Sequence, residues 1–138
     1  MEPTTRLRQL ADALNERDWH TYADCFTEDL IVHAPGIRSI GREARVKWVH
    51  DLIRAFPDGQ ITLDRVLTEH DHICAELTFE GTHTGPMASP NGTVPPTGRE
   101  VMFPYCLVMR LRDDKIAEVH EYFDRVELLT QLGLLASV

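Results

Sequence analysis

The spacing of apolar residues changes once along the chain, from the period of an amphipathic helix to the period of a strand. Before residue 57, apolar residues recur every three or four positions, as Leu7, Leu10 and Leu14 do. Over residues 73–79 they instead alternate with polar residues. Helices that precede a run of strands predict an α+β fold, in which the helices pack on one face of a curved antiparallel sheet.

Three helices and one short strand are predicted before this change of period. The first helix covers residues 7–14, with the threonines at 4–5 as candidate N-caps. The second helix is short and begins after Asp18, and the third covers residues 42–56 until a Pro-Asp-Gly sequence ends it. A strand is predicted over residues 30–33, between the second and third helices.

The second part of the chain is predicted to contain four strands and a short closing helix. The strands are expected over residues 61–65, 73–80, 99–112 and 115–123, and the helix over residues 126–135. The segment 99–112 is apolar on both faces, which is typical of a central strand. Residues 85–98 contain four of the eight prolines, so we expect a long loop there that covers a pocket.

The length and charge of the chain exclude several classes of function. With 138 residues, it is expected to form a single domain over residues 1–138. Its net charge is −8 and its Lys and Arg residues do not cluster, so neither nucleic acid nor an anionic membrane is expected as a partner. No apolar run approaches the roughly 18 residues of a membrane span, and the first residues do not resemble a signal peptide, which predicts a cytoplasmic protein. The three cysteines are widely spaced, which indicates thiols rather than disulfides.

Asp124 is the first candidate for acid/base chemistry. It follows the last predicted strand and lies between Phe123 and Val126, where an apolar environment would raise the pKa of a carboxyl group. Asp is also a common N-cap, so Asp124 could simply begin the closing helix. Both interpretations are open at this point. Asp124 has the same strand parity as Glu118 and His120, so these side chains are expected on one face.

Two further histidines are candidates for the same site. His83 has the parity of Leu77 and Phe79, so it is expected on the core side, at the start of the proline-rich loop. His33 ends the first predicted strand, where a loop can open a pocket. A lone histidine on an apolar face, such as His83, is usually a hydrogen-bonded core residue, and His33 is equally compatible with a simple position on the surface.

Motifs for metals and common cofactors are missing from the sequence. The run His70-Asp71-His72 lies in a predicted turn, where adjacent side chains diverge, and no third ligand follows at a characteristic spacing. The chain has no dinucleotide-binding glycine motif, no phosphate-loop lysine motif and no serine nucleophile elbow. We therefore expect no metal and no cofactor.

Several short segments together resemble the SnoaL-like polyketide cyclase (ester cyclase) family of the nuclear transport factor 2-like superfamily. The matching segments, in order, are Ala55–Asp58, Phe79–Gly85, Pro96–Arg99, Asp114–Glu118, Asp124 and Leu128–Gly133. The resemblance implies a cone-shaped α+β fold, with a curved sheet and three N-terminal helices around an apolar pocket. It also implies a cofactor-independent intramolecular aldol cyclisation of a polyketide-type substrate.

The resemblance also implies roles for individual residues. Asp124 matches the position of the family's catalytic aspartate and is expected to be the base, while His83, His120 and His33 are expected to orient the substrate or stabilise an enolate oxygen. His120 departs from the family, which commonly has a tryptophan there, and this places a titratable group in the expected pocket wall. The substrate-binding residues are expected among the aromatic side chains Trp19, Tyr22, Trp48, Phe79, Phe103, Tyr105 and Tyr122.

Other functions on the same fold stay open. The chemistry could be that of an isomerase, a dehydratase or another lyase, or an epoxide hydrolase, for which Arg110 and Asp124 would supply only part of the machinery. The ketosteroid isomerase machinery is missing, because Ala34 precedes Pro35 where those enzymes have an aspartate. The chain could also be a non-catalytic module that binds a small apolar molecule. The exposed face of such sheets commonly pairs, so we expect a homodimer or a higher homo-oligomer.

Overall fold

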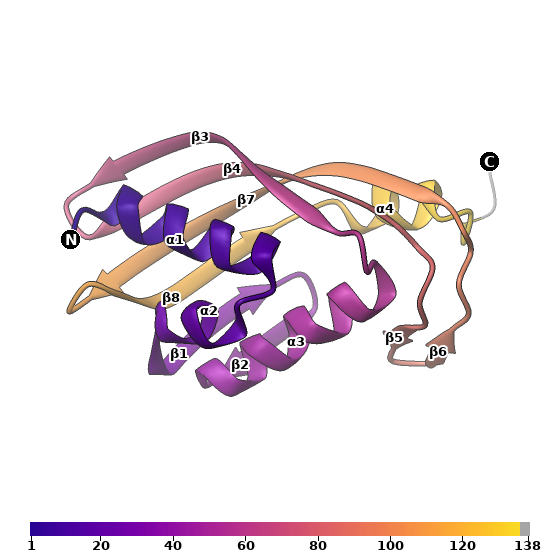
Figure 1. Cartoon of the computed structure of the whole chain (residues 1–138), viewed down its shortest axis with the longest axis horizontal. Coiled ribbons are helices and arrows are strands. Elements are labelled where there is room, and N and C mark those ends of the chain that lie inside the picture. The colour runs from indigo at the N-terminus through magenta and orange to yellow at the C-terminus, as the bar shows by residue number, and fades with distance from the viewer. Residues whose placement is uncertain (136–138) are drawn as a thin grey trace.

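The computed structural model describes residues 1–135 and contains one large curved sheet with helices packed on one of its faces (Figure 1). The helices are α1 (Pro3–Glu16), α2 (Trp19–Asp24), α3 (Arg42–Ala55) and α4 (Arg125–Gln131). Helices α1 to α3 cover the concave face of the sheet, and α4 lies at the far end of β7 and β8. The α+β class expected from the sequence is confirmed, and the sheet is open rather than closed into a barrel.

The large sheet has six strands in the order β2-β1-β8-β7-β4-β3. These strands are β1 (Phe26–Ala34), β2 (Ile37–Ile40), β3 (Gln60–Glu69), β4 (His72–Thr82), β7 (Glu100–Arg112) and β8 (Lys115–Tyr122). Neighbouring strands run antiparallel except β1 and β8, which pair in parallel. The longest strand, β7, lies in the middle of the sheet between β8 and β4, as its apolar composition on both faces predicts.

The ends of the helices show which sequence signals were correct. Asp18 caps α2 by accepting a hydrogen bond from the backbone N–H of Thr21 at 3.1 Å, as predicted. The prediction that threonines 4–5 cap α1 is wrong, because α1 begins one residue after Glu2 with Pro3 in its first turn. Proline fits there because its missing N–H is one that a first turn leaves unpaired in any case.

Three short strands, in two places, were not predicted. Residues Ile37–Ile40 form β2, which pairs with the end of β1 around a turn at Pro35 and Gly36. The proline-rich segment 85–98 is not a plain loop, since Met87–Ser89 (β5) and Gly92–Val94 (β6) form a separate two-stranded hairpin. Both additions are short, and sequence periodicity over three or four residues is too brief to separate a strand from a loop.

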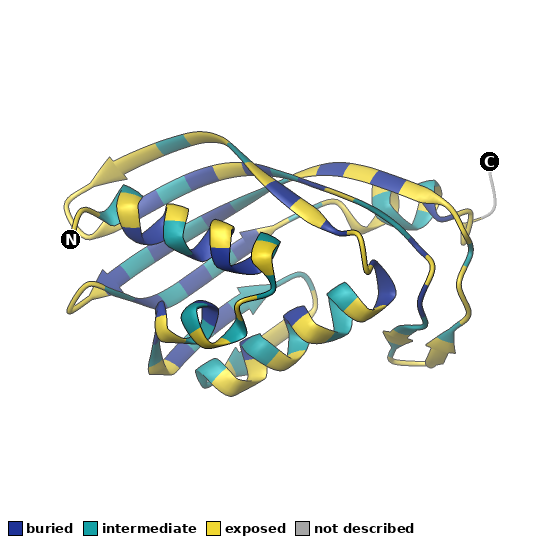
Figure 2. Ribbon diagram, viewed as in Figure 1, coloured by how far each residue is buried: buried dark blue, intermediate teal, exposed yellow. Residues whose placement is uncertain are grey.

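The hydrophobic core lies between the helices and the concave face of the sheet. Alternate residues of β4 and β7 are buried there, and the neighbouring residues face outward (Figure 2). Leu7 on α1, Phe56 after α3 and Phe79 on β4 are among the largest fully buried side chains. No helix among residues 1–135 is long and apolar enough to cross a membrane.

Candidate active site

An apolar cavity lies between α3 and the concave face of the sheet. Its wall is built from α3, the inner faces of β4, β7 and β8, and one residue each of α1, β3 and α4: Leu14, Arg45, Trp48, Val49, Leu52, Ile61, Phe79, Phe103, Tyr105, Glu121, Phe123 and Leu128. Its volume is about 70 Å³, whereas one water needs roughly 10–15 Å³ measured in the same way. Only two of the twelve residues of this wall carry a charge, Arg45 and Glu121.

Arg45 and Glu121 form a buried ion pair across the cavity wall. The Nη2 of Arg45 lies 3.0 Å from the Oε1 of Glu121, and the two side chains are 9% and 3% exposed. The Nε of Arg45 donates a second hydrogen bond to the hydroxyl of Tyr22 at 3.2 Å, and its guanidinium carbon lies 4.8 Å from the centre of the Trp48 ring. Burial is the largest single influence and opposes the charge on Arg45, but the charges of Glu121 and Tyr22 and the hydrogen bonds to both together outweigh it and raise the pKa of Arg45 above its ordinary value.

The second carboxylate oxygen of Glu121 does not take part in the ion pair with Arg45. Its Oε2 is buried and has no hydrogen-bond partner among the described residues. A buried carboxylate oxygen without a partner is unusual, because desolvation without compensation costs free energy. Glu121 is also one of the residues that line the cavity, so this oxygen belongs to a side chain of the cavity wall.

Tyr105 supplies a second polar group to the cavity wall. It lies on β7, and its neighbours across the sheet are Leu77 on β4 and the strand β8 that carries Glu121. Burial raises the pKa of the Tyr105 hydroxyl well above its ordinary value. The phenol therefore stays protonated at neutral pH and can donate a hydrogen bond to a substrate oxygen.

Asp124 lies outside this cavity. Its side chain is exposed and caps α4, accepting a hydrogen bond from the backbone N–H of Glu127 at 3.1 Å. The structure thus shows the helix-cap arrangement that the sequence left open. The apolar environment expected around Asp124 is not present, because the residues of α4 that surround it leave it in contact with solvent. Its role as the base stays a prediction based on the resemblance.

His83 is fully buried but does not line the cavity. Its Nδ1 accepts a hydrogen bond from the backbone N–H of Thr97 at 3.1 Å, so the ring joins the end of β4 to the chain just before β7. Its Nε2 has no partner among the described residues, and burial lowers the pKa of His83. The arrangement is that of a core histidine that fixes the base of the proline-rich segment, and a catalytic role for His83 stays a prediction.

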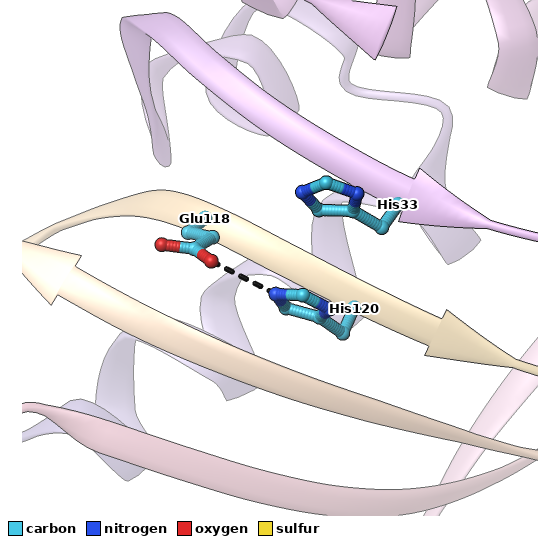
Figure 3. A group of neighbouring side chains, drawn as sticks. All are labelled: His33, Glu118 and His120. Carbon is cyan, nitrogen blue, oxygen red and sulfur yellow. Dashed lines mark hydrogen bonds and ion pairs between the residues drawn. The ribbon is translucent and has the colours of Figure 1, made fainter. Parts of the chain in front are cut away.

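His33 and His120 lie together, but on the convex face of the sheet. They are direct neighbours across the parallel pair β1 and β8, with ring centres 4.5 Å apart (Figure 3). The expectation that His120 belongs to the pocket wall is wrong, because side chains alternate along β8 and it is Val119 and Glu121 that face the helices. Glu118 shares the convex face with His120, as the common parity predicted.

The seven aromatic residues predicted to bind substrate divide into two groups. Trp48, Phe79, Phe103 and Tyr105 line the cavity. The other three lie elsewhere: Tyr22 is buried behind Arg45, Trp19 packs against His50, and Tyr122 is exposed on the convex face.

The sequence interpretation missed Arg45 and Glu121, although both carry a signal. Glu121 continues the buried series of alternate residues that contains Ala117 and Val119. Arg45 precedes the buried Val49 by one helical turn, so it lies on the inner face of α3. A charged residue in an apolar series is expected to be either paired or functional.

Solved structures place this fold in a known class. An NTF2-like protein from Cytophaga hutchinsonii superimposes with a TM-score of 0.71 at 14% identity, over 94% of this chain and 96% of that one. IdmH from Streptomyces antibioticus gives a TM-score of 0.81 at 26% identity, over 96% of this chain and 99% of its own. AclR from Streptomyces galilaeus gives 0.83 at 24% identity, over 99% and 87% of the two chains. The fold is therefore the nuclear transport factor 2-like fold.

The family follows from the sequence match. The model of the SnoaL-like polyketide cyclase family matches residues 4–132, and this protein belongs to that family. Membership supports an enzyme of the cyclase or isomerase type that acts on a small apolar molecule. No match was found among curated proteins.

Proposed function

We propose that this protein is a general acid/base enzyme that closes a ring in a small polyketide-type carbonyl compound by an intramolecular aldol reaction. The observation that carries the proposal is the free Oε2 of Glu121, a buried carboxylate oxygen on the wall of an apolar cavity. A buried carboxylate oxygen that accepts no hydrogen bond from the protein is well suited to accept a proton from an acidic C–H bond.

In such a reaction Glu121 acts first as the base and then as the acid. Glu121 removes a proton from the carbon between two carbonyl groups, and the electron pair of that C–H bond moves onto the neighbouring carbonyl oxygen as an enolate. The enolate carbon then attacks a second carbonyl of the same molecule, which forms a C–C bond and an alkoxide. The protonated Glu121 returns its proton to that alkoxide, so the reaction needs no cofactor.

Two groups support the charge that develops on oxygen. Arg45 stays positively charged beside Glu121 and holds the carboxylate through Oε1, which leaves Oε2 free for the substrate. Tyr105 is positioned in the same wall, and its phenol can donate a hydrogen bond to the enolate oxygen. The apolar remainder of the wall, including Phe79 and Phe103, excludes water from the reacting groups.

The proposal assigns the base to Glu121, whereas the family resemblance assigns it to Asp124. The burial and free oxygen of Glu121 favour it, since Asp124 is exposed and its carboxylate already caps α4. His33, His83 and His120 lie outside the cavity wall, so the proposal does not use them.

The first experiment measures proton abstraction from a model compound and so does not require the natural substrate. Methyl acetoacetate, a small β-keto ester, is incubated with the protein in D₂O, and the loss of its C2 proton signal is followed by NMR. The wild-type protein is expected to accelerate the exchange, and Glu121→Gln to lose at least about 100-fold of that acceleration, which is the lower range for a general base. Glu76→Gln is the matched control, because Glu76 is an exposed glutamate on the convex face of the same sheet.

A second variant covers the case in which Glu121→Gln does not fold. The double variant Arg45→Met/Glu121→Leu removes both charges and leaves no uncompensated charge in the core. It is expected to fold, as judged by circular dichroism, and to give only the background rate of exchange. Full exchange activity in this folded variant, or no acceleration by the wild-type protein, would contradict the proposal and favour a binding module.

We also propose that the protein forms a homodimer, as expected from the resemblance. The convex face of the sheet exposes the large side chains of Met102 and Tyr122. These exposed side chains favour a contact between two copies of the chain through this face. Light scattering at micromolar concentration tests this, and a monomeric mass would contradict it.

A further inference from the structure

The convex face of the sheet carries a second polar cluster that the proposed reaction does not use. His33 on β1 and His120 on β8 are paired in the sheet, and their rings stack with an interplanar angle of 14°. The Oε1 of Glu118 lies 2.8 Å from the Nε2 of His120. One ligand atom from each of these three residues lies within 4.8 Å of the other two. Figure 3 shows both rings side by side, with Glu118 at the same end of each.

The sheet itself brings these residues together. His33 and His120 are opposite each other in register, and Glu118 precedes His120 by two residues, so all three side chains leave the same face. A rigid strand pair holds ligands more accurately than a loop does. The geometry is unlike that of His70-Asp71-His72, which are consecutive residues at the turn from β3 into the start of β4.

The chemistry of the three donors is selective. Two imidazole nitrogens and one carboxylate oxygen form a set that binds Zn²⁺ at about 2.0–2.2 Å per bond. Two ligands at that bond length lie roughly 3–4 Å apart around a tetrahedral ion. The donors of this cluster are therefore close to the required spacing, and small rotations of half-exposed side chains would bring them to it.

Two arginines lie beside the cluster. The Nε of Arg110 on β7 lies 3.5 Å from Oε2 of Glu118, so it engages the oxygen that faces away from His120 and leaves Oε1 for an ion. Holding the carboxylate in this way is what an outer-shell partner of a metal ligand commonly does. Arg38 on β2 is opposite His33, and its positive charge disfavours a cation there. The remaining neighbour, Val108 on β7 opposite His120, is uncharged.

We infer that His33, Glu118 and His120 form a site for a divalent transition-metal ion, for which Zn²⁺ is the best match. The three residues supply three ligands, and solvent supplies the remaining positions because the cluster is half exposed. The ion would bridge β1 and β8, the parallel pair of the sheet. The site is separate from the cavity, since His120 and Glu121 leave opposite faces of β8.

The test is a titration of the tag-free protein with Zn²⁺ by isothermal titration calorimetry. One Zn²⁺ is expected to bind per chain, and His33→Ala and His120→Ala are each expected to weaken binding by at least about tenfold. His72→Ala is the matched control, because His72 is an exposed histidine beside the carboxylate of Asp71 at 2.8 Å. This control is expected to bind Zn²⁺ as the wild type does.

A second measurement needs no variant. Co²⁺ is paramagnetic and broadens the NMR signals of nuclei near it, so substoichiometric Co²⁺ is expected to broaden the amide signals of His33 and His120 first. Broadening centred on His70 and His72 would overturn the inference. So would Zn²⁺ binding that is unchanged in the double variant His33→Ala/His120→Ala, or the absence of Zn²⁺ binding to the wild type.

Discussion

The two faces of β8 carry the same side chain in two different settings. Glu121 faces the helices and is 3% exposed, whereas Glu118, three residues earlier, faces outward and its side chain is 32% exposed. Glu121 has one paired and one free oxygen. Both oxygens of Glu118 are engaged, one by His120 and the other by Arg110. The comparison shows that burial and partners, rather than residue type, set the environment of each carboxylate, and the two proposals assign them different roles on that basis.

The buried pair is costly to maintain, and this is part of the argument for function. Moving a carboxylate and a guanidinium out of water carries a desolvation penalty that their attraction only partly offsets. A well-packed apolar pair in the place of Arg45 and Glu121 would serve the core at least as well. The ion pair is therefore better explained by chemistry in the cavity than by stability alone.

The largest expected effect comes from removing one member of the buried pair. Glu121→Ala leaves the Arg45 charge uncompensated in the core and is expected to lower the free energy of unfolding by about 3–5 kcal/mol. Glu76→Ala breaks the exposed ion pair with Arg65 and is expected to cost less than about 1 kcal/mol. Urea unfolding of both variants measures the difference, and equal losses would show that the inner pair is not desolvated.

The apolar double variant sharpens the same comparison. Arg45→Met/Glu121→Leu is expected to unfold within about 1 kcal/mol of the wild type or above it, because both charges leave the core together. The two positions are therefore expected to be strongly non-additive in a double-mutant cycle. Additive losses, measured by the same urea unfolding, would contradict a direct interaction between the two side chains.

Asp124 is expected to show the smaller effect of a helix cap. Asp124→Ala removes the hydrogen bond to the backbone N–H of Glu127 and is expected to cost about 1 kcal/mol in urea unfolding. Asp18→Ala is the matched control, because Asp18 caps α2 with the same 3.1 Å bond to a backbone N–H. A loss of unfolding free energy as large as that of Glu121→Ala would indicate that Asp124 contributes more to stability than a helix cap does.

The smallest expected effect is the pH dependence contributed by Glu118. The hydrogen bond from His120 is the main cause that holds the pKa of Glu118 below its ordinary value of 4.5, and the charge of His120 and the hydrogen bond and charge of Arg110 act in the same direction. A carboxylate with a lowered pKa in the folded protein stabilises it above the unfolded pKa and loses that contribution as the pH falls through the folded pKa. The difference in stability between the wild type and Glu118→Gln is therefore expected to be under about 1 kcal/mol at pH 7, since the group is partly exposed.

Thermal unfolding of the two proteins between pH 7 and pH 3 measures this contribution. The difference between them is expected to shrink as the pH falls below about 4.5, because the negative charge of Glu118 is then lost. A difference that grows below pH 4.5 would contradict the assigned direction of the pKa shift.

The order of the elements was largely predictable from the sequence, because long segments have a clear period. Helix α3 and strand β7 lie close to the expected residues, and the Asp113-Asp114 turn joins β7 to β8 with both residues in the left-handed region. Short elements such as β2 were missed because a few residues carry too little periodic signal. The parallel pairing of β1 with β8 was also missed, since it depends on contacts between residues far apart in the chain.

The candidate site was predicted less well, for a physical reason. The sequence interpretation followed parity from Glu118 to Asp124 and placed that face inside, yet the buried series of β8 includes Val119 and Glu121. Parity shows which residues share a face, but only tertiary packing decides which face is covered by helices. The pairing of Arg45 with Glu121 likewise depends on how α3 lies across the sheet, which local patterns do not contain.

The most direct test of the account compares Glu121→Gln with Asp124→Asn in the exchange of the C2 proton of methyl acetoacetate. We expect Asp124→Asn to retain most of the wild-type acceleration and Glu121→Gln to lose it, because only Glu121 presents a buried, unpartnered oxygen to the cavity. The reverse result, with exchange lost in Asp124→Asn and kept in a folded Glu121→Gln, would show that the exposed cap at the start of α4 is the base and that the buried ion pair is structural.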